Sequence, residues 1–170
     1  MSNKNTLRKK ISGFQDIKVL IIGDLILDEF LWGDVSRISP EAPVPVVWVK
    51  SESFMPGGAS NVASNIHVLG GKAYLAGVVG LDERGNALRN ILQEKGINIE
   101  GIFVDEKRPT TLKTRVIAHH QQVVRIDKEN NHCIESDLID RISEYVKGII
   151  KEIDVIIIED YGKALSHQSY

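Results

Sequence analysis

Three short apolar runs along the chain predict strands of a buried sheet. They are residues 17–24, a run that ends at Val78-Val79-Gly80, and residues 154–160. The first and the last are rich in Val and Ile, and each ends at a carboxylate. A near-continuous β-branched run is typical of a strand that is buried on both faces. We therefore expect these three segments to lie side by side in a parallel sheet.

Three further segments carry small and apolar residues spaced three or four apart, which predicts helices. They are residues 59–69, 83–95 and 136–152, and glycines that can end a helix follow the first two. Ser136 is the expected N-cap of the third helix, which is expected to bury Leu138, Ile139, Ile142, Val146, Ile149 and Ile150. Strands that alternate with helices predict a mostly parallel, doubly wound α/β sheet.

Two segments, residues 29–54 and 110–127, do not follow this alternation of strands and helices. The first contains the alternating stretch Val44-Pro45-Val46-Val47-Trp48-Val49, and the second alternates on both sides of a polar turn at residues 119–122. Alternation with a period of two predicts antiparallel strand pairs outside the parallel core. We expect a leader over residues 1–16 and one domain over residues 17–170 that includes both strand pairs.

Composition narrows the class of protein. The chain has 170 residues, 42% hydrophobic and 26% charged, which is typical of a globular domain. A net charge of -2 argues against a nucleic-acid partner, because phosphate binding requires a basic excess. A single cysteine suits a reducing compartment, and no secretory signal or membrane-length apolar run is present. We expect a cytoplasmic protein with no membrane partner.

The glycine pair Gly57-Gly58 directly precedes the first predicted helix. Glycines there allow close approach of a ligand to the backbone, and exposed N–H groups favour an anionic or hydroxyl-rich partner. Asn61, in the first turn, can both donate to and accept from a sugar hydroxyl. The alternative is a tight strand-to-helix turn with no ligand.

Two carboxylates follow the first predicted strand. Open α/β sheets place ligands beyond the carboxyl ends of their strands, where a carboxylate can accept hydrogen bonds from adjacent hydroxyls of a polyol. Asp28 fits this role, whereas a capping or surface carboxylate is the better interpretation of Asp24.

The spacing of Gly57-Gly58-Ala59-x-Asn61-x-Ala63, Gly70 and Gly80 resembles the first signature of the ribokinase/PfkB carbohydrate kinases. Within that family, residues 33–46, 114–116, 121–127 and 160–163 are similar to D-glycero-D-manno-heptose 7-phosphate kinases. The resemblance implies a ribokinase-like fold in which the two interrupting segments form a small antiparallel β lid over the sugar, and the lids of two subunits pack into a homodimer. It implies a sugar-phosphate substrate and these binding residues: Asp28, Gly57, Gly58, Asn61, Arg115, Asp160 and Lys163.

The family's catalytic aspartate in a Gly-Ala-Gly-Asp turn and its Asn-x-x-Glu magnesium motif have no match in this sequence. We therefore expect the chain to be the sugar-binding, N-terminal part of a kinase domain, truncated before the nucleotide-binding half and inactive alone. The catalytic base is expected beyond its end. The resemblance implies ATP and Mg²⁺ for the complete enzyme, and neither is expected to bind this chain well. No metal site is expected, since the adjacent pairs His119-His120 and His132-Cys133 cannot easily share one metal.

The expected reaction of the complete enzyme is ATP-dependent phosphorylation of the heptose 7-phosphate to its 1,7-bisphosphate, which would feed ADP-heptose and surface polysaccharide synthesis. Two alternatives stay open. One is a PfkB kinase for fructose 6-phosphate, ribose or a nucleoside, which the segment Arg37–Val46 argues against. The other is a non-catalytic sugar-phosphate-binding or dimerisation module.

Overall fold

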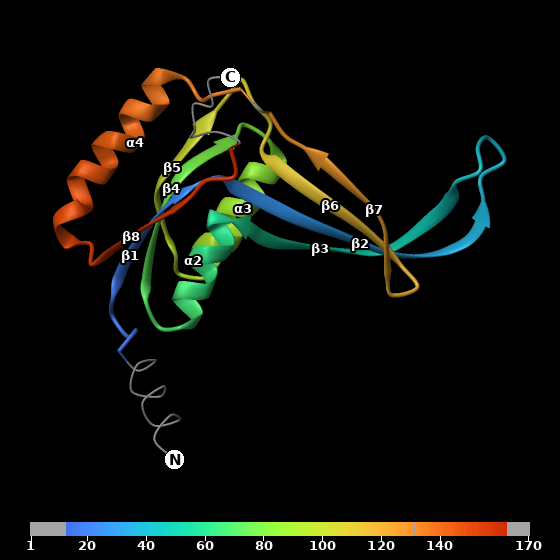
Figure 1. Cartoon of the computed structure of the whole chain (residues 1–170), viewed down its shortest axis with the longest axis horizontal. Helices are drawn as coiled ribbons and strands as arrows, with labels where there is room; N and C mark the ends of the chain where they lie inside the picture. The colour runs from blue at the N-terminus through green and yellow to red at the C-terminus, as the bar shows by residue number, and fades with distance from the viewer. Residues whose placement is uncertain (1–12, 131, 163–170) are drawn as a thin grey trace, which may run out of the picture.

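A parallel four-stranded sheet forms the centre of the molecule in the computed structural model, which describes residues 13–130 and 132–162 (Figure 1). The strand order is β5-β4-β1-β8, with bounds Lys18–Gly23 for β1, Lys72–Gly80 for β4, Asn98–Asp105 for β5 and Val155–Glu159 for β8. The three predicted core strands are therefore confirmed. Strand β5 was not predicted, because Glu100 and Gly101 interrupt its apolar residues.

Helices cover both faces of this sheet, which confirms the doubly wound arrangement (Figure 1). Helices α2 (Ala59–Val68) and α3 (Glu83–Glu94) pack on one face. Helix α4 (Ser136–Ile149), extended by the short 3₁₀ helix η1 (Ile150–Glu152), packs on the other. Side chains of β1 alternate between the two cores, so that Val19 and Ile21 face α2 and α3 whereas Leu20 faces α4.

Helix α4 differs from its prediction in two respects. Glu135, not Ser136, is the N-cap residue, and it makes no capping hydrogen bond through its side chain. Leu138 and Ile142 are buried, but Ile139 and Ile150 are each 44% exposed. Successive helical residues are rotated by about 100°, so the stripe that places Leu138 against the sheet turns Ile139 toward its margin.

A second sheet, which we call the lid, extends from the parallel sheet as a long arm (Figure 1). Its order is β3-β2-β6-β7, with bounds Leu25–Ile38 for β2, Pro45–Gly58 for β3, Thr111–Ala118 for β6 and Gln121–Lys128 for β7. The pairs β2–β3 and β6–β7 are antiparallel, as predicted. Strands β2 and β6 pair in parallel, so the two predicted antiparallel pairs join into a mixed sheet and not into the antiparallel lid that the resemblance implied.

The base of the lid is continuous with the core. Leu25, Ile26 and Leu27 are almost completely buried, and Leu25 follows the end of β1 with only Asp24 between them. The lid strands therefore begin at the carboxyl end of the parallel sheet. Across the described residues, no helix combines the length and apolar character needed to cross a membrane.

Candidate functional site

Three parts of the chain meet at Asp24, directly after β1. Its carboxylate oxygen Oδ2 accepts a hydrogen bond from the backbone N–H of Tyr161 at 2.8 Å. Its backbone carbonyl accepts one from Ala59 N–H, at the start of α2, at 3.0 Å. Asp24 is only 3% exposed, so it is a buried carboxylate that caps backbone groups and not a surface residue. This residue holds the ends of β1 and β8 and the start of α2 together.

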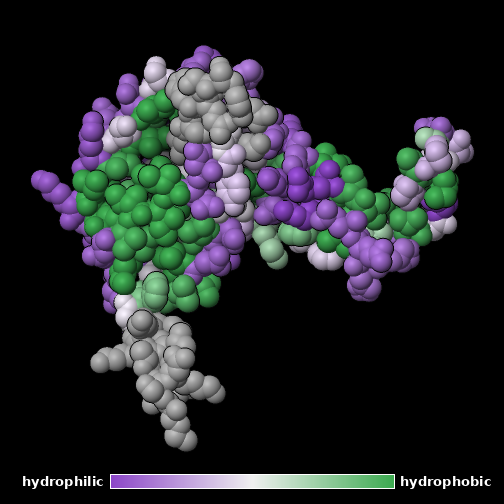
Figure 2. Space-filling model, in the orientation of Figure 1, coloured by the Kyte–Doolittle hydropathy of each residue, from purple (hydrophilic) through white to green (hydrophobic). Residues whose placement is uncertain are grey.

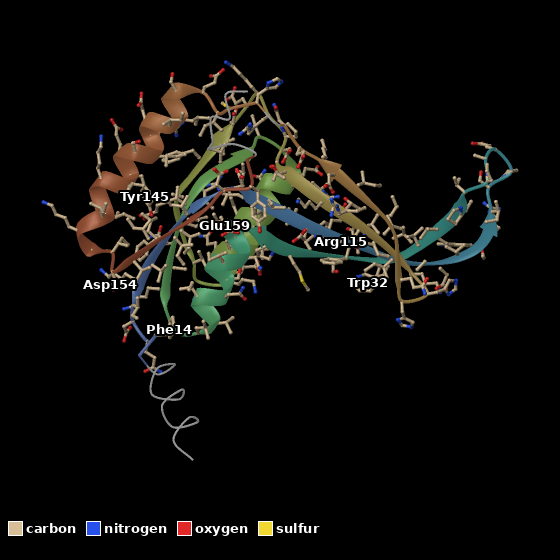
Figure 3. The ribbon with its side chains drawn as sticks, viewed as in Figure 1. Phe14, Trp32, Arg115, Tyr145, Asp154 and Glu159 are labelled. Atoms are coloured by element: carbon tan, nitrogen blue, oxygen red, sulfur yellow. The ribbon has the colours of Figure 1, made fainter. Side chains whose placement is uncertain are left out.

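Asp28 lies on β2 at the base of the lid and forms an ion pair with an arginine of β6. The Arg115 Nη1–Asp28 Oδ1 distance is 2.5 Å, and the side chains are 25% and 21% exposed. The Arg115 guanidinium also lies over the Phe30 ring, 5.3 Å from its centroid. This contact and the ion pair hold the guanidinium in place while leaving part of it accessible. Figure 3 shows Arg115 on the lid, with Glu159 near the lid's base.

Lys113 brings a second cation to the same face, because side chains two residues apart on a strand point to the same side. Its Nζ lies 5.9 Å from the centroid of the Tyr161 ring, and β6 residue Lys113 is in register with Asp28. Tyr161 therefore lies between the parallel sheet and the lid. A hydrogen bond to the Glu159 carboxylate, the charge of Glu159, partial burial and the charge of Asp28 together raise the pKa of the Tyr161 hydroxyl.

The two glycines before α2 are required by close contacts. A Cβ atom on Gly57 would lie 2.5 Å from Asp28 Oδ2, so a larger residue would displace the carboxylate. Gly58 has a φ of +54°, and a Cβ there would lie 2.5 Å from the Asp24 carbonyl oxygen. Gly58 is the N-cap residue of α2, and Asn61 is exposed in the first turn of that helix. The glycine pair thus brings the start of α2 next to Asp28.

Of the two remaining predicted site residues, the structure describes only one. Asp160 is exposed and accepts a hydrogen bond from Gly162 N–H at 2.7 Å, which stabilises the turn after β8. Lys163 lies outside the described residues. Glu159 and Tyr161 were absent from the predicted set. Their position directly after a core strand, where such sheets bind ligands, is the signal that would have found them.

This arrangement suits a ligand that carries both hydroxyl groups and an anionic group. Carboxylates such as Asp28 accept hydrogen bonds from hydroxyls, whereas arginine and lysine side chains donate only and match phosphate oxygens. Among residues 13–130 and 132–162, no group of three or more His, Cys, Asp or Glu side chains is arranged to hold a metal ion.

Comparison with known proteins defines the class to which this fold and site belong. The family model described as "pfkB family carbohydrate kinase" matches residues 16–169, so the chain belongs to the PfkB carbohydrate kinases.

Among individual proteins, the chain is similar to the "Bifunctional protein HldE" of Desulfatibacillum aliphaticivorans, with 43% identity over 169 residues. It is 48% identical over 148 residues to the protein of the same name from Helicobacter pylori strain J99. The alignments cover 99% and 87% of this chain but only 35% and 32% of those relatives. The chain therefore spans about a third of their length.

Solved structures support the ribokinase-like fold. A carbohydrate kinase from Agrobacterium tumefaciens matches with a TM-score of 0.62 and 19% identity, over 84% of this chain and 45% of that protein. Arabidopsis thaliana ribokinase, solved with ribose and ATP, matches with a TM-score of 0.59 and 13% identity, over 85% and 45% of the two chains. At these identities the likeness establishes the fold alone.

Proposed function

We propose that this chain binds the sugar-phosphate substrate of a PfkB kinase, and that the substrate is D-glycero-D-manno-heptose 7-phosphate. The observation that carries the proposal is the grouping of Asp28, Lys113 and Arg115 on one face of the lid, beside Tyr161. One carboxylate accepts from sugar hydroxyls, and two cations remain for a phosphate. The similarity to the HldE proteins supports a heptose as the sugar.

The pairing of Arg115 with Asp28 is compatible with this role. A guanidinium has five N–H donors, and the ion pair with Asp28 is made through Nη1 alone. Its other donors can bind phosphate without loss of that contact. The stacked Phe30 ring limits the freedom of the guanidinium, which lowers the entropy lost when it binds an oxyanion.

ATP and Mg²⁺ are the co-substrate and metal that membership of the family implies for a complete enzyme. The described residues do not fit the metal, since no group of three or more His, Cys, Asp or Glu side chains among them is arranged to hold one. We therefore derive no step of phosphoryl transfer from this chain and expect no sugar phosphorylation by it alone. The proposed product of the complete enzyme is the heptose 1,7-bisphosphate.

We further propose that the lid pairs with the lid of a second copy. The part of the lid distant from the parallel sheet exposes large apolar side chains, including Trp48 at 74%, Ile38 at 60% and Val49 at 44%. Figure 2 shows hydrophobic residues along this arm. Exposed apolar surface of this kind is typical of protein interfaces. Sedimentation of the chain and of a Trp48→Glu variant tests the pairing. The variant should not dimerise through this contact.

Calorimetric titration of the chain with heptose 7-phosphate, fructose 6-phosphate and ribose tests the substrate. We expect the heptose phosphate to bind most tightly, and ribose weakly because it offers no phosphate to Lys113 and Arg115. Asp28→Ala should weaken heptose phosphate binding about 10- to 150-fold, the cost of a hydrogen bond to a charged group. Asp24→Ala should show whether that buried cap affects binding only through folding, which circular dichroism monitors.

Two results would contradict the proposal. Tighter binding of fructose 6-phosphate or ribose would show that the sugar is a different one. Binding by Asp28→Ala within about twofold of the parent would show that the site lies elsewhere. A further experiment supplies ATP, Mg²⁺ and the remaining part of a related protein together with the chain. If the heptose phosphate then binds but is not phosphorylated, the non-catalytic module is favoured instead.

A further inference from the structure

A buried carboxylate lies directly behind the proposed site, on the opposite face of the lid. Glu29 follows Asp28 on β2, and successive strand side chains point to opposite faces. The Glu29 side chain is only 7% exposed. Its oxygen Oε1 lies 2.7 Å from Arg84 Nη2 of α3, and its Oε2 accepts a hydrogen bond from the Thr114 hydroxyl of β6 at 2.5 Å. Both carboxylate oxygens are therefore engaged.

Arg84 connects the helix to a third strand. Its guanidinium lies over the Phe54 ring of β3, 4.7 Å from the ring centroid. Glu29, Phe54 and Thr114 occupy directly paired positions on the three adjacent strands β3, β2 and β6. We call these three residues, together with Arg84, the lid clamp. Through it, a single arginine of the core helix contacts three strands of the lid, either directly or through Glu29.

The lid clamp and the site are joined through the backbone of two strands. Glu29 is the neighbour of Asp28, and Thr114 is the neighbour of Arg115, so these two clamp residues each lie one position from a member of the ion pair. A displacement of either strand at the clamp must therefore move Asp28 or Arg115 by a similar amount. Tyr161, in contrast, is held by Asp24 on the parallel sheet. The clamp thus sets the distance between the two halves of the site.

We propose that Arg84 and Glu29 are positioning residues for sugar-phosphate binding: their ion pair holds the lid against α3 so that Asp28 and Arg115 face Tyr161. A carboxylate this buried is stable only with its partner, because an unpaired buried charge is strongly unfavourable. Without Arg84, Glu29 keeps only the Thr114 hydroxyl as a partner, and hydration of its other oxygen requires a shift of strand β2 that moves Asp28. The identity of the ligand rests on the proposed function, whereas the positioning of the lid does not.

Four variants of the full chain test this inference: Arg84→Ala, Arg84→Lys, Glu29→Gln, and the double variant Glu29→Gln/Arg84→Ala. Lys50→Ala is the matched control, since Lys50 forms an ion pair with Asp34 within the lid, away from α3. The first measurement is affinity for heptose 7-phosphate. The second is amide hydrogen exchange over residues 28–30 and 113–115, which requires no ligand.

We expect Arg84→Ala to weaken binding about tenfold, since misplacement of a site by about 1 Å has effects of this size or larger. Amides of residues 28–30 and 113–115 should exchange about tenfold faster, with β1 and β4 unchanged. Arg84→Lys should recover part of both effects, because it keeps the charge. The double variant should lose no more affinity than the single variant that binds more weakly, as expected for residues that act through each other. Lys50→Ala should match the parent.

Unchanged exchange over residues 28–30 and 113–115 in both Arg84→Ala and Glu29→Gln would overturn the inference, whatever the ligand. So would unchanged affinity in these variants while Asp28→Ala binds weakly. If Asp28→Ala also binds normally, the proposed function fails, and the exchange measurement alone decides the role of the clamp. Should Arg84→Ala not fold, Glu29→Gln and Arg84→Lys, which nearly preserve side-chain volume, provide the same comparison.

Discussion

Asp82, the N-cap residue of α3, is predicted to be a principal determinant of stability because it links that helix to the lid. Its Oδ1 accepts hydrogen bonds from Gly85 N–H at 2.8 Å and from the Thr110 hydroxyl at 2.7 Å. Its Oδ2 accepts one from Thr110 N–H at 2.9 Å. Thr110 is 2% exposed, and it immediately precedes β6. One carboxylate therefore caps a helix and fixes the start of a lid strand.

Replacement of Asp82 by alanine removes all three hydrogen bonds. Loss of the helix cap costs about 1 kcal/mol. Thr110 N–H then lacks its acceptor in a buried position, which costs roughly 1–3 kcal/mol. We expect the free energy of unfolding to fall by about 3 kcal/mol. For a domain of this size that corresponds to a decrease in Tm on the order of 9 °C.

Thermal and urea unfolding followed by circular dichroism measure this effect. Glu83→Ala is the control, because Glu83 is the next residue, is exposed and lies in the same helical turn, so its replacement should change stability by less than about 0.5 kcal/mol. An Asp82→Ala variant within about 0.5 kcal/mol of the parent would refute the reasoning. It would show that water or another residue satisfies Thr110 N–H.

The pH dependence of the same group provides an independent check. Burial raises the pKa of Asp82, but the hydrogen bonds from Thr110 and Gly85 outweigh it and leave the pKa below its usual value. A lowered native pKa means that the unfolded state takes up protons first. The contribution of Asp82 is therefore fully present above the unfolded pKa of about 3.9 and is lost as pH falls through the native value. Between pH 6 and pH 3, the parent should lose more stability than Asp82→Ala.

Three further predictions concern other parts of the chain. Gly57→Ala should weaken heptose phosphate binding more than Gly148→Ala, because only the first added methyl group would contact Asp28; equal affinities would contradict this. Burial, and then the charges of Glu100 and Tyr74, raise the pKa of Tyr145 to about 12. Tyr145 should therefore contribute a fall in stability of about 1 kcal/mol from pH 9 to pH 11, and Tyr145→Phe, measured by urea unfolding, should make the fall of the whole chain smaller by this amount. Ile158 is 71% exposed on β8, at the edge of the parallel sheet in the described part of the chain, and Val155 and Ile156 of the same strand are also exposed. Ile158→Lys should reduce self-association in light scattering, and unchanged association would show that β8 is not the contact.

Local pattern was sufficient to predict most secondary structure. The apolar run of β1 and the glycines that follow α2 and α3 act over a few residues, so they can be recognised without knowledge of the fold. Alternation and a polar turn likewise predicted the β6–β7 pair, whose two strands are neighbours in sequence. The pairing of β2 with β6 was not predictable in this way. More than 70 residues separate the two strands, as shown by the pairing of Ile26 with Thr111, and alternation does not specify a partner.

Some features of the candidate site could likewise be predicted from the sequence, whereas others required the tertiary structure. The position of Asp28 after a buried strand, and the glycine pair before α2, are properties of sequence that point to a ligand site by themselves. The ion pair of Asp28 with Arg115, and the contact of Arg84 with Glu29, are visible only in the tertiary structure. Periodicity determines which face of a strand a side chain occupies. Which charge it meets there depends on chain segments brought together by folding, and burial then makes the choice of partner energetically important.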